Sequence, residues 1–141
     1  MQLDAVEKLG LSIKKVQSRH HRGLDLRLRK IGISLVQWSA LREICRNPGA
    51  SAHALAMATF NSDQAFGTLS ARLEKLDYIR REPGHGRAIV HKLTTKGEKL
   101  LKNGRKIMIR FLEESFAPLS AKEKSVLQDI LTAILEHNLQ S

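Results

Sequence analysis

The sequence predicts a mainly α-helical fold with one small β-hairpin. Apolar residues recur at intervals of three and four along most of the chain, which is the spacing of amphipathic helices. Three pairs of the form Ser/Thr-x-x-Glu/Gln stand where helices are expected to begin. Two short runs, Tyr78–Glu82 and Ala88–Leu93, flank the turn sequence PGHGR, which predicts a hairpin. Helices are therefore expected on both sides of a single pair of strands.

Length and composition indicate one globular domain spanning residues 1–141. The 141 residues suffice for one core, and 42% hydrophobic with 27% charged residues is ordinary for a folded protein. No apolar run is long enough to cross a bilayer, and the N-terminus lacks the pattern of a signal peptide, so a cytoplasmic location is expected. The single cysteine, Cys45, excludes an internal disulfide and a thiolate zinc cluster.

The charge balance favours a polyanionic partner. Lys and Arg total 24 against 14 Asp and Glu, which gives a formal net charge of +10. A positive surplus of this size is typical of proteins that bind nucleic acid. The alternative is that the charge serves solubility alone.

The first predicted helix runs from Leu3 to about Lys30 and carries many basic residues on its open side. Its apolar positions are Leu3, Val6, Leu9, Ile13, Val16, His20 and Leu24. Gly10 and Gly23 weaken it. Because such a long helix exceeds the needs of a small core, we expect it to pack against a helix of a second subunit.

A capping box at Ser34 and Gln37 opens the second predicted helix, Leu35 to about Arg46. Its apolar stripe is Val36, Leu41, Ile44 and Cys45, and Trp38 can reach a neighbouring helix. Cys45 is accordingly expected to be a small core residue.

Two short helices joined by a tight link follow. Ser51 is expected to cap a helix ending near Thr59, and Ser62 to cap one ending near Leu76, with Phe60 and Asn61 between them. This arrangement predicts a helix-turn-helix, whose second helix enters the DNA major groove.

The second of these helices has two different faces. Ala65, Leu69, Leu73 and Leu76 form an apolar stripe, which is expected to be buried. The opposite face carries Gln64, Thr68, Arg72 and Lys75, with only Gly67 and Ala71 between them. Amide, hydroxyl and cationic side chains are those that recognise base edges and phosphates. The alternative is an ordinary amphipathic surface helix.

The hairpin follows at once and is basic. Asp77 stands where a left-handed residue is expected to end the helix. Arg80, Arg81, Arg87 and Lys92 lie on the hairpin, which predicts a winged helix-turn-helix with its loop against phosphates or the minor groove.

Two further helices are expected after the hairpin. Capping boxes at Thr95/Glu98 and Ser120/Glu123 open them, and Pro118 separates them. The last helix has a wide apolar face of Val126, Leu127, Ile130, Leu131, Ile134 and Leu135. We interpret this face as a dimer surface. The alternative is burial against the first helix of the same chain.

The motifs GISLVQWSALREI, PGASAHALA, SARLEKLDYIRRE and GRAIVHKLTTKGEKLL resemble the MarR family of winged-helix transcription regulators, over about Gly32 to Leu101. The resemblance implies a homodimer with a DNA-binding lobe at residues 32–101 and dimerisation helices mainly at 1–31 and 105–141. It also implies a pseudo-palindromic operator with half-sites about 10 base pairs apart, and repression that is relieved by a small anionic aromatic effector.

On this hypothesis Gln64, Thr68 and Arg72 contact bases, while Ser62, Lys75 and Arg87 contact phosphates or the minor groove. Three residues depart from the family pattern: Asp77 replaces the usual glycine, His85 replaces an aspartate of the wing, and Gly67 lies within the recognition helix.

Other functions have less support. The sequence lacks the G-x-S-x-G, P-loop and Rossmann motifs, so no enzyme and no cofactor are expected. Neither a metal site at His20 and His21 nor redox sensing at Cys45 is expected. His53, His85 and His91 are expected to lie near DNA or in solvent. The second functional hypothesis is a non-specific architectural DNA-binding protein or a protein-binding winged helix.

Overall fold

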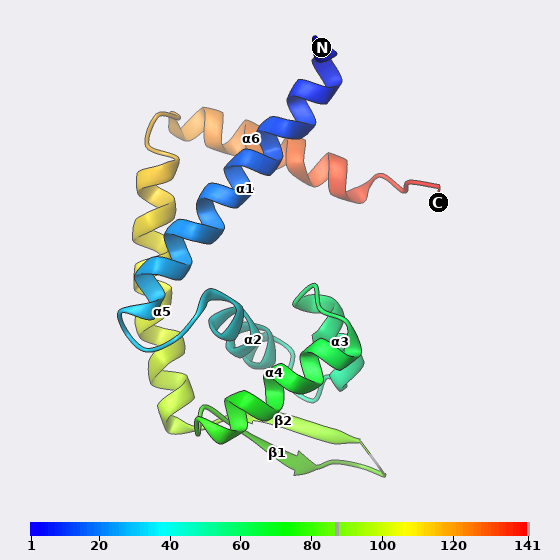
Figure 1. Ribbon diagram of the computed structural model, residues 1–141, viewed down its shortest axis with the longest axis vertical. Coiled ribbons are helices and arrows are strands. Elements are labelled where there is room, and N and C mark those ends of the chain that lie inside the picture. The colour runs from blue at the N-terminus through cyan, green and yellow to red at the C-terminus, as the bar shows by residue number, and fades with distance from the viewer. Residues whose placement is uncertain (87, 141) are drawn as a thin grey trace.

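The computed structural model describes residues 1–86 and 88–140 and confirms a mainly helical fold with one hairpin (Figure 1). A compact lobe lies at one end, and a helical arm extends from it along the long axis. The elements are α1 (Ala5–Arg29), α2 (Leu35–Arg46), α3 (Ala52–Ala58), α4 (Asp63–Lys75), β1 (Ile79–Pro83), β2 (Ile89–Leu93), α5 (Thr95–Ser115) and α6 (Ala121–Glu136).

Side-chain caps fix where the helices begin. The predicted boxes at Ser34/Gln37 and Ser120/Glu123 are both present, and Ser51 and Ser62 cap α3 and α4. The predicted box at Thr95 is wrong by one residue, because Thr94 is the N-cap of α5. The Thr94 hydroxyl accepts from the Gly97 N–H at 3.0 Å and donates to the Asp77 carbonyl at 2.6 Å. Thr94 therefore also ties α5 to the end of α4.

The core of the lobe is anchored on α5 through Trp38. Trp38 is buried, and its indole N–H donates to the Leu101 carbonyl at 3.2 Å, so the predicted contact with a neighbouring helix is confirmed. Gly104 lies directly beneath the indole, where a Cβ would overlap Trp38. The remaining core residues are Leu24, Leu28, Ile33, Leu35, Ala40, Leu41, Ile44, Leu55, Ala56, Phe66, Leu73, Tyr78, Ile79 and Phe111.

The buried stripe of α4 differs from the predicted one by one position. Phe66, Ser70 and Leu73 are buried, whereas Ala65 is exposed. Phe66 has far more apolar surface to remove from water than the single methyl group of Ala65, so the helix turns Phe66 inward. Leu69 lies at the margin of the core.

Cys45 is exposed, so its predicted place in the core is wrong. Leu41 and Ile44 are buried on α2, but Cys45 lies about 100° further around the helix than Ile44. Val36, also expected in the stripe, is exposed for the same geometric reason.

The hairpin is antiparallel and pairs Ile79 with Leu93 through to Pro83 with Ile89. Asp77 has a φ of +64°, as expected for the residue that ends α4. Tyr78 then bonds back to the Leu73 carbonyl at 2.9 Å. The chain therefore turns sharply from α4 into β1.

The apolar face of α6 is not covered by its own chain. No residue of α6 is buried, and Ile130, Ile134 and Leu135 are 52%, 54% and 83% exposed. Figure 1 shows α6 crossing α1 at the end of the arm far from the lobe. The alternative of burial against α1 is therefore wrong within one chain. None of the helices within residues 1–86 and 88–140 is both long and apolar enough to span a membrane.

Candidate nucleic-acid interface

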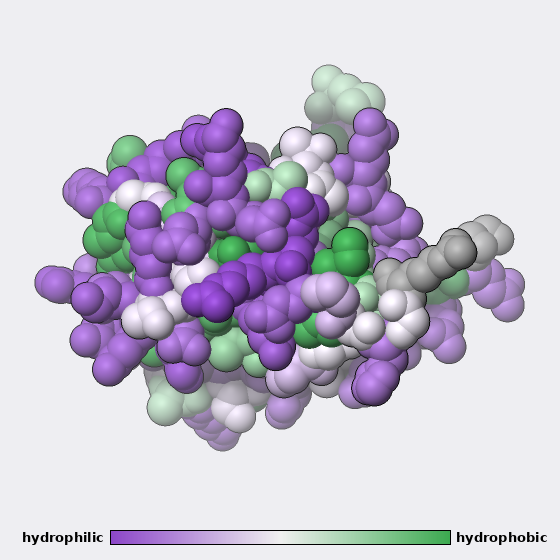
Figure 2. Space-filling model, turned by 90° about the horizontal axis from the view of Figure 1, so that it is seen from below, coloured by the Kyte–Doolittle hydropathy of each residue, from purple (hydrophilic) through white to green (hydrophobic). Residues whose placement is uncertain are grey.

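One face of α4 is wholly exposed. We define the recognition face as the six residues Gln64, Gly67, Thr68, Ala71, Arg72 and Lys75, and each of them is exposed. It lies opposite the buried Phe66 and Leu73, so burial of those side chains fixes its outward direction. Figure 2 shows hydrophilic side chains over much of the end of the lobe, with small apolar patches between them.

The hydroxyl groups of α4 are already oriented by the helix. Ser62 accepts from the Ala65 N–H at 3.1 Å, which leaves its own O–H free to donate to a phosphate. Thr68 donates to the Gln64 carbonyl at 3.2 Å. Its oxygen can therefore still accept a hydrogen bond from a base edge.

Helices α3 and α4 are joined at the surface by His53 and Asp63, whose side chains lie 2.8 Å apart. Both side chains are 69% exposed. His53 is thus exposed to solvent, which was one of the two places expected for it. The pair braces the turn of the helix-turn-helix near the N-terminus of α4.

The hairpin is locked to α4 by Glu74 and Arg81. The Arg81 guanidinium donates to one oxygen of Glu74 at 2.9 and 3.2 Å, and its backbone N–H donates to the other at 3.1 Å. The hydrogen bonds from Arg81 lower the pKa of Glu74 below its ordinary value. We call this contact the α4–wing pair.

Two of the four basic residues of the hairpin are held in ion pairs. Arg81 is held by Glu74, and Lys92 pairs with Glu82 at 3.1 Å. Arg80 is exposed. Arg87, the predicted minor-groove residue, lies outside the described residues. The sequence could not show which cations are paired, since the pairing depends on how β1 is placed against α4.

His91 is buried beneath α4, so its predicted place near DNA or in solvent is wrong. It is 6% exposed, and its ring meets that of Phe66 at a centroid distance of 5.6 Å. Its Nδ1 has no hydrogen-bond partner among the described residues. Burial, and then the nearby Arg81, lowers its pKa below the ordinary 6.5. Within β2, His91 is buried while the next residue, Lys92, is exposed, which agrees with the alternation of side chains along a strand.

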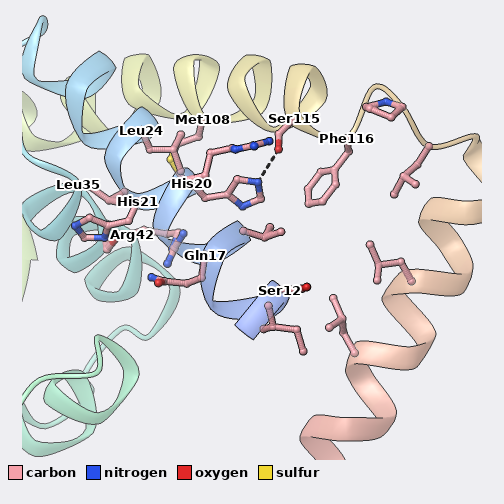
Figure 3. Close-up of a pocket in the computed structure, with 18 residues that line it drawn as sticks. Ser12, Gln17, His20, His21, Leu24, Leu35, Arg42, Met108, Ser115 and Phe116 are labelled. Atoms are coloured by element: carbon pink, nitrogen blue, oxygen red, sulfur yellow. Dashed lines mark hydrogen bonds between the residues drawn. The ribbon is translucent and has the colours of Figure 1, made fainter. Parts of the chain in front are cut away.

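A mainly apolar cavity of about 710 Å³ lies between the arm and the lobe (Figure 3). Residues of α1, α2, α5 and α6 line it, and Arg19, His20 and His21 are among them. His20 lies 2.7 Å from the Ser115 hydroxyl, with its ring edge-on to Phe111 and Phe116. Burial, and then Arg19, lowers the pKa of His20. The cavity therefore combines an apolar lining with a few polar groups.

Metal binding has no structural support in the described part of the chain. Residues 1–86 and 88–140 bring no three His, Cys, Asp or Glu side chains into a group that could hold an ion. His20 and His21 are adjacent on α1, and His20 bonds to Ser115 instead.

A helix-turn-helix, a polar recognition helix and a hairpin locked beside it define a winged helix-turn-helix protein. A family model described as the MarR family matches residues 31–88. The matched segment and the shared fold together support a MarR family winged helix-turn-helix regulator. No curated protein matches the chain by sequence.

Solved structures share the fold at low sequence identity. A mutant of MarR from E. coli complexed with operator DNA is 22% identical with a TM-score of 0.84, covering 94% of this chain and 99% of that one. The organohalide-sensing regulator RdhR-CbdbA1625 bound to 2,4-dichlorophenol is 21% identical with a TM-score of 0.84, covering 97% and 83%. A MarR family protein of Mycobacterium tuberculosis, Rv2887, complexed with salicylic acid is 23% identical with a TM-score of 0.73, covering 89% and 95%.

The buried His91 makes stability depend on pH. Its pKa is lowered in the folded state, so the unfolded chain binds more protons below pH 6.5 and acidification favours unfolding. His91→Phe is expected to reduce the fall in unfolding free energy between about pH 8 and about pH 5.5, by at most about 1.4 kcal/mol per pH unit. Urea denaturation at each pH measures this.

The matched control is His85→Phe, because His85 is exposed in the hairpin turn. It should leave the pH dependence unchanged. An equal effect of both variants would show that burial of His91 is not the cause.

Proposed function

We propose that the protein is a sequence-specific, double-stranded-DNA-binding transcription regulator that acts as a homodimeric repressor. The observation that carries the proposal is the recognition face, six exposed residues of α4 with no apolar side chain larger than alanine. Gln64, Thr68 and Arg72 are proposed to contact bases, and Ser62, Lys75 and Arg87 to contact phosphates or the minor groove.

Electrostatics and one similar structure support this partner. The net charge is +10, and Arg72 and Lys75 stand on the recognition face without a salt bridge among the described residues. The E. coli MarR mutant, which has this fold, was crystallised with operator DNA. If a dimer neutralises on the order of 10 phosphates, log K should fall with log salt at a slope of about −9.

A homodimer is proposed because α6 and the first part of α1 leave apolar side chains in solvent. Val6, Leu9, Ile13, Ile130 and Ile134 are between 47% and 71% exposed. A second copy would bury these surfaces and place a second recognition helix on the DNA. The operator is then proposed to be pseudo-palindromic, with half-sites about 10 base pairs apart.

A small anionic aromatic effector is proposed for the cavity beside His20. The apolar lining suits a ring, and Arg19, His20 and Arg42 supply polar contacts at its edge. Similar structures contain salicylic acid and 2,4-dichlorophenol. The cavity lies between the arm and the lobe. A ligand bound there is therefore proposed to shift each lobe relative to the arm, to change the spacing between the lobes of the two subunits, and so to relieve repression.

The alternative is a non-specific architectural DNA-binding protein or a protein-binding winged helix. The varied donors and acceptors of the recognition face favour the sequence-specific function, since phosphate binding alone needs only cations. An enzymatic activity is not proposed. The proposed partner, DNA, makes the cytoplasm the proposed location.

Selection from a random duplex pool at defined salt is expected to enrich one sequence. Binding to it should survive an excess of random duplex, and Arg72→Ala should cost about 1 to 3 kcal/mol while relaxing preference at one base position. The control is Arg105→Ala, which removes an exposed cation of α5. If no sequence is enriched, or both variants act alike, specific recognition by α4 is refuted.

Ile134→Asp is expected to give monomers that bind the selected duplex poorly, because a carboxylate would be placed in an apolar interface. Light scattering and a binding titration measure the two effects. Gln128→Asp adds the same charge at an exposed polar position of α6 and should remain dimeric. Tight binding by monomeric Ile134→Asp would contradict recognition of two half-sites.

An aromatic carboxylate such as salicylate is expected to bind at one site per subunit and to weaken DNA binding. Ser39→Trp should abolish this binding by filling the cavity that Ser39 lines. Val36→Trp, on the exposed side of the same helix, should retain it. Calorimetry measures both, and equal binding by the two variants would place the effector elsewhere.

A further inference from the structure

The turn between α3 and α4 holds an aromatic side chain in solvent. Phe60 has a φ of +59° and is 97% exposed. Positive φ is costly for a residue with a Cβ, and bulky residues adopt it rarely. An exposed phenyl ring also gains nothing from the hydrophobic effect. Both features are unfavourable in the lobe by itself.

The left-handed conformation is imposed by the residues around Phe60. The Phe60 N–H donates to Met57 at 3.1 Å and the Asn61 N–H to Ala56 at 2.8 Å, both through backbone carbonyls. The Asn61 side chain also donates to the Thr59 hydroxyl at 2.9 Å. These bonds do not involve the ring. Glycine would adopt the same backbone without strain, so the ring itself requires another explanation.

Phe60 stands directly before the recognition helix. It precedes Ser62, the N-cap of α4, by two residues, so its Cα lies within about 7 Å of that of Ser62. In a helix-turn-helix the first residues of the recognition helix contact base edges. The turn that leads into them then lies at the edge of the groove.

We propose that Phe60 is a further DNA-contacting residue, whose ring packs on the deoxyribose and thymine-methyl groups at the edge of the groove that α4 enters. This inference rests on the proposed function. DNA offers few apolar groups, and the thymine methyl is the one that apolar side chains contact in the major groove. Phe60 lies two residues before Ser62 and four before Gln64, both of which are proposed to contact DNA. This closeness favours DNA over a separate protein partner. Backbone strain of this kind, at a residue whose side chain does not stabilise the fold, is characteristic of functional positions.

The test uses Phe60→Gly and Phe60→Asn in the full chain, since both residues tolerate positive φ. Each variant is expected to unfold at the same temperature as the parent protein or higher. Each should bind the selected duplex about tenfold more weakly, with an unchanged slope of log K against log salt because the ring carries no charge. Met57→Ala removes another exposed apolar side chain, on α3, and should bind within about twofold of the parent.

Several results would overturn the inference. Unchanged binding by both variants would show that the ring does not touch DNA. Weakening by Phe60→Gly alone would indicate loss of rigidity in the turn, and weakening together with a change in oligomeric state would indicate contact between copies of the chain. If the parent protein enriches no duplex, the proposed function fails as well, whereas enrichment with unaffected variants removes only the role of Phe60.

Discussion

The packing of the lobe against α5 is the contact on which the remaining structure depends. Trp38 donates its indole N–H to the backbone of α5, and Gly104 leaves room for the ring above it. A second glycine of α5, Gly97, lies against the Tyr78 carbonyl, where a Cβ would overlap the backbone. These two close approaches hold α2 and the start of the hairpin against one helix. On this frame, burial of Phe66 and Leu73 turns the recognition face outward.

The elements could be predicted from the sequence because their signals are local. Serine caps and helical spacing placed α2, α4 and α6, and the turn sequence placed the hairpin. The finer errors arose where tertiary packing decides. Ala65 or Phe66, and Ile44 or Cys45, are neighbours in sequence, and only the rotation of the helix against its partners selects the buried one.

The candidate site shows the same division. Exposure of Gln64, Thr68, Arg72 and Lys75 follows from helical spacing, whereas the roles of these residues toward DNA stay predictions. The α4–wing pair and the burial of His91 could not be derived, because both depend on how β1 and β2 lie beneath α4. Charge counting along the hairpin overestimates the cations free for DNA, since two of them are neutralised by Glu74 and Glu82.

The length of α5 has a mechanical consequence. Its 21 residues form one continuous helix from the hairpin to the turn before α6, as Figure 1 shows, and at 1.5 Å per residue it spans about 31 Å. A rod of that length converts a tilt of about 3° at its far end into a displacement of about 1.6 Å at the lobe. Side chains that hydrogen-bond to bases tolerate only a few tenths of an ångström. Small adjustments among the arm helices are thus amplified into a displacement of the lobe that is larger than a hydrogen bond tolerates.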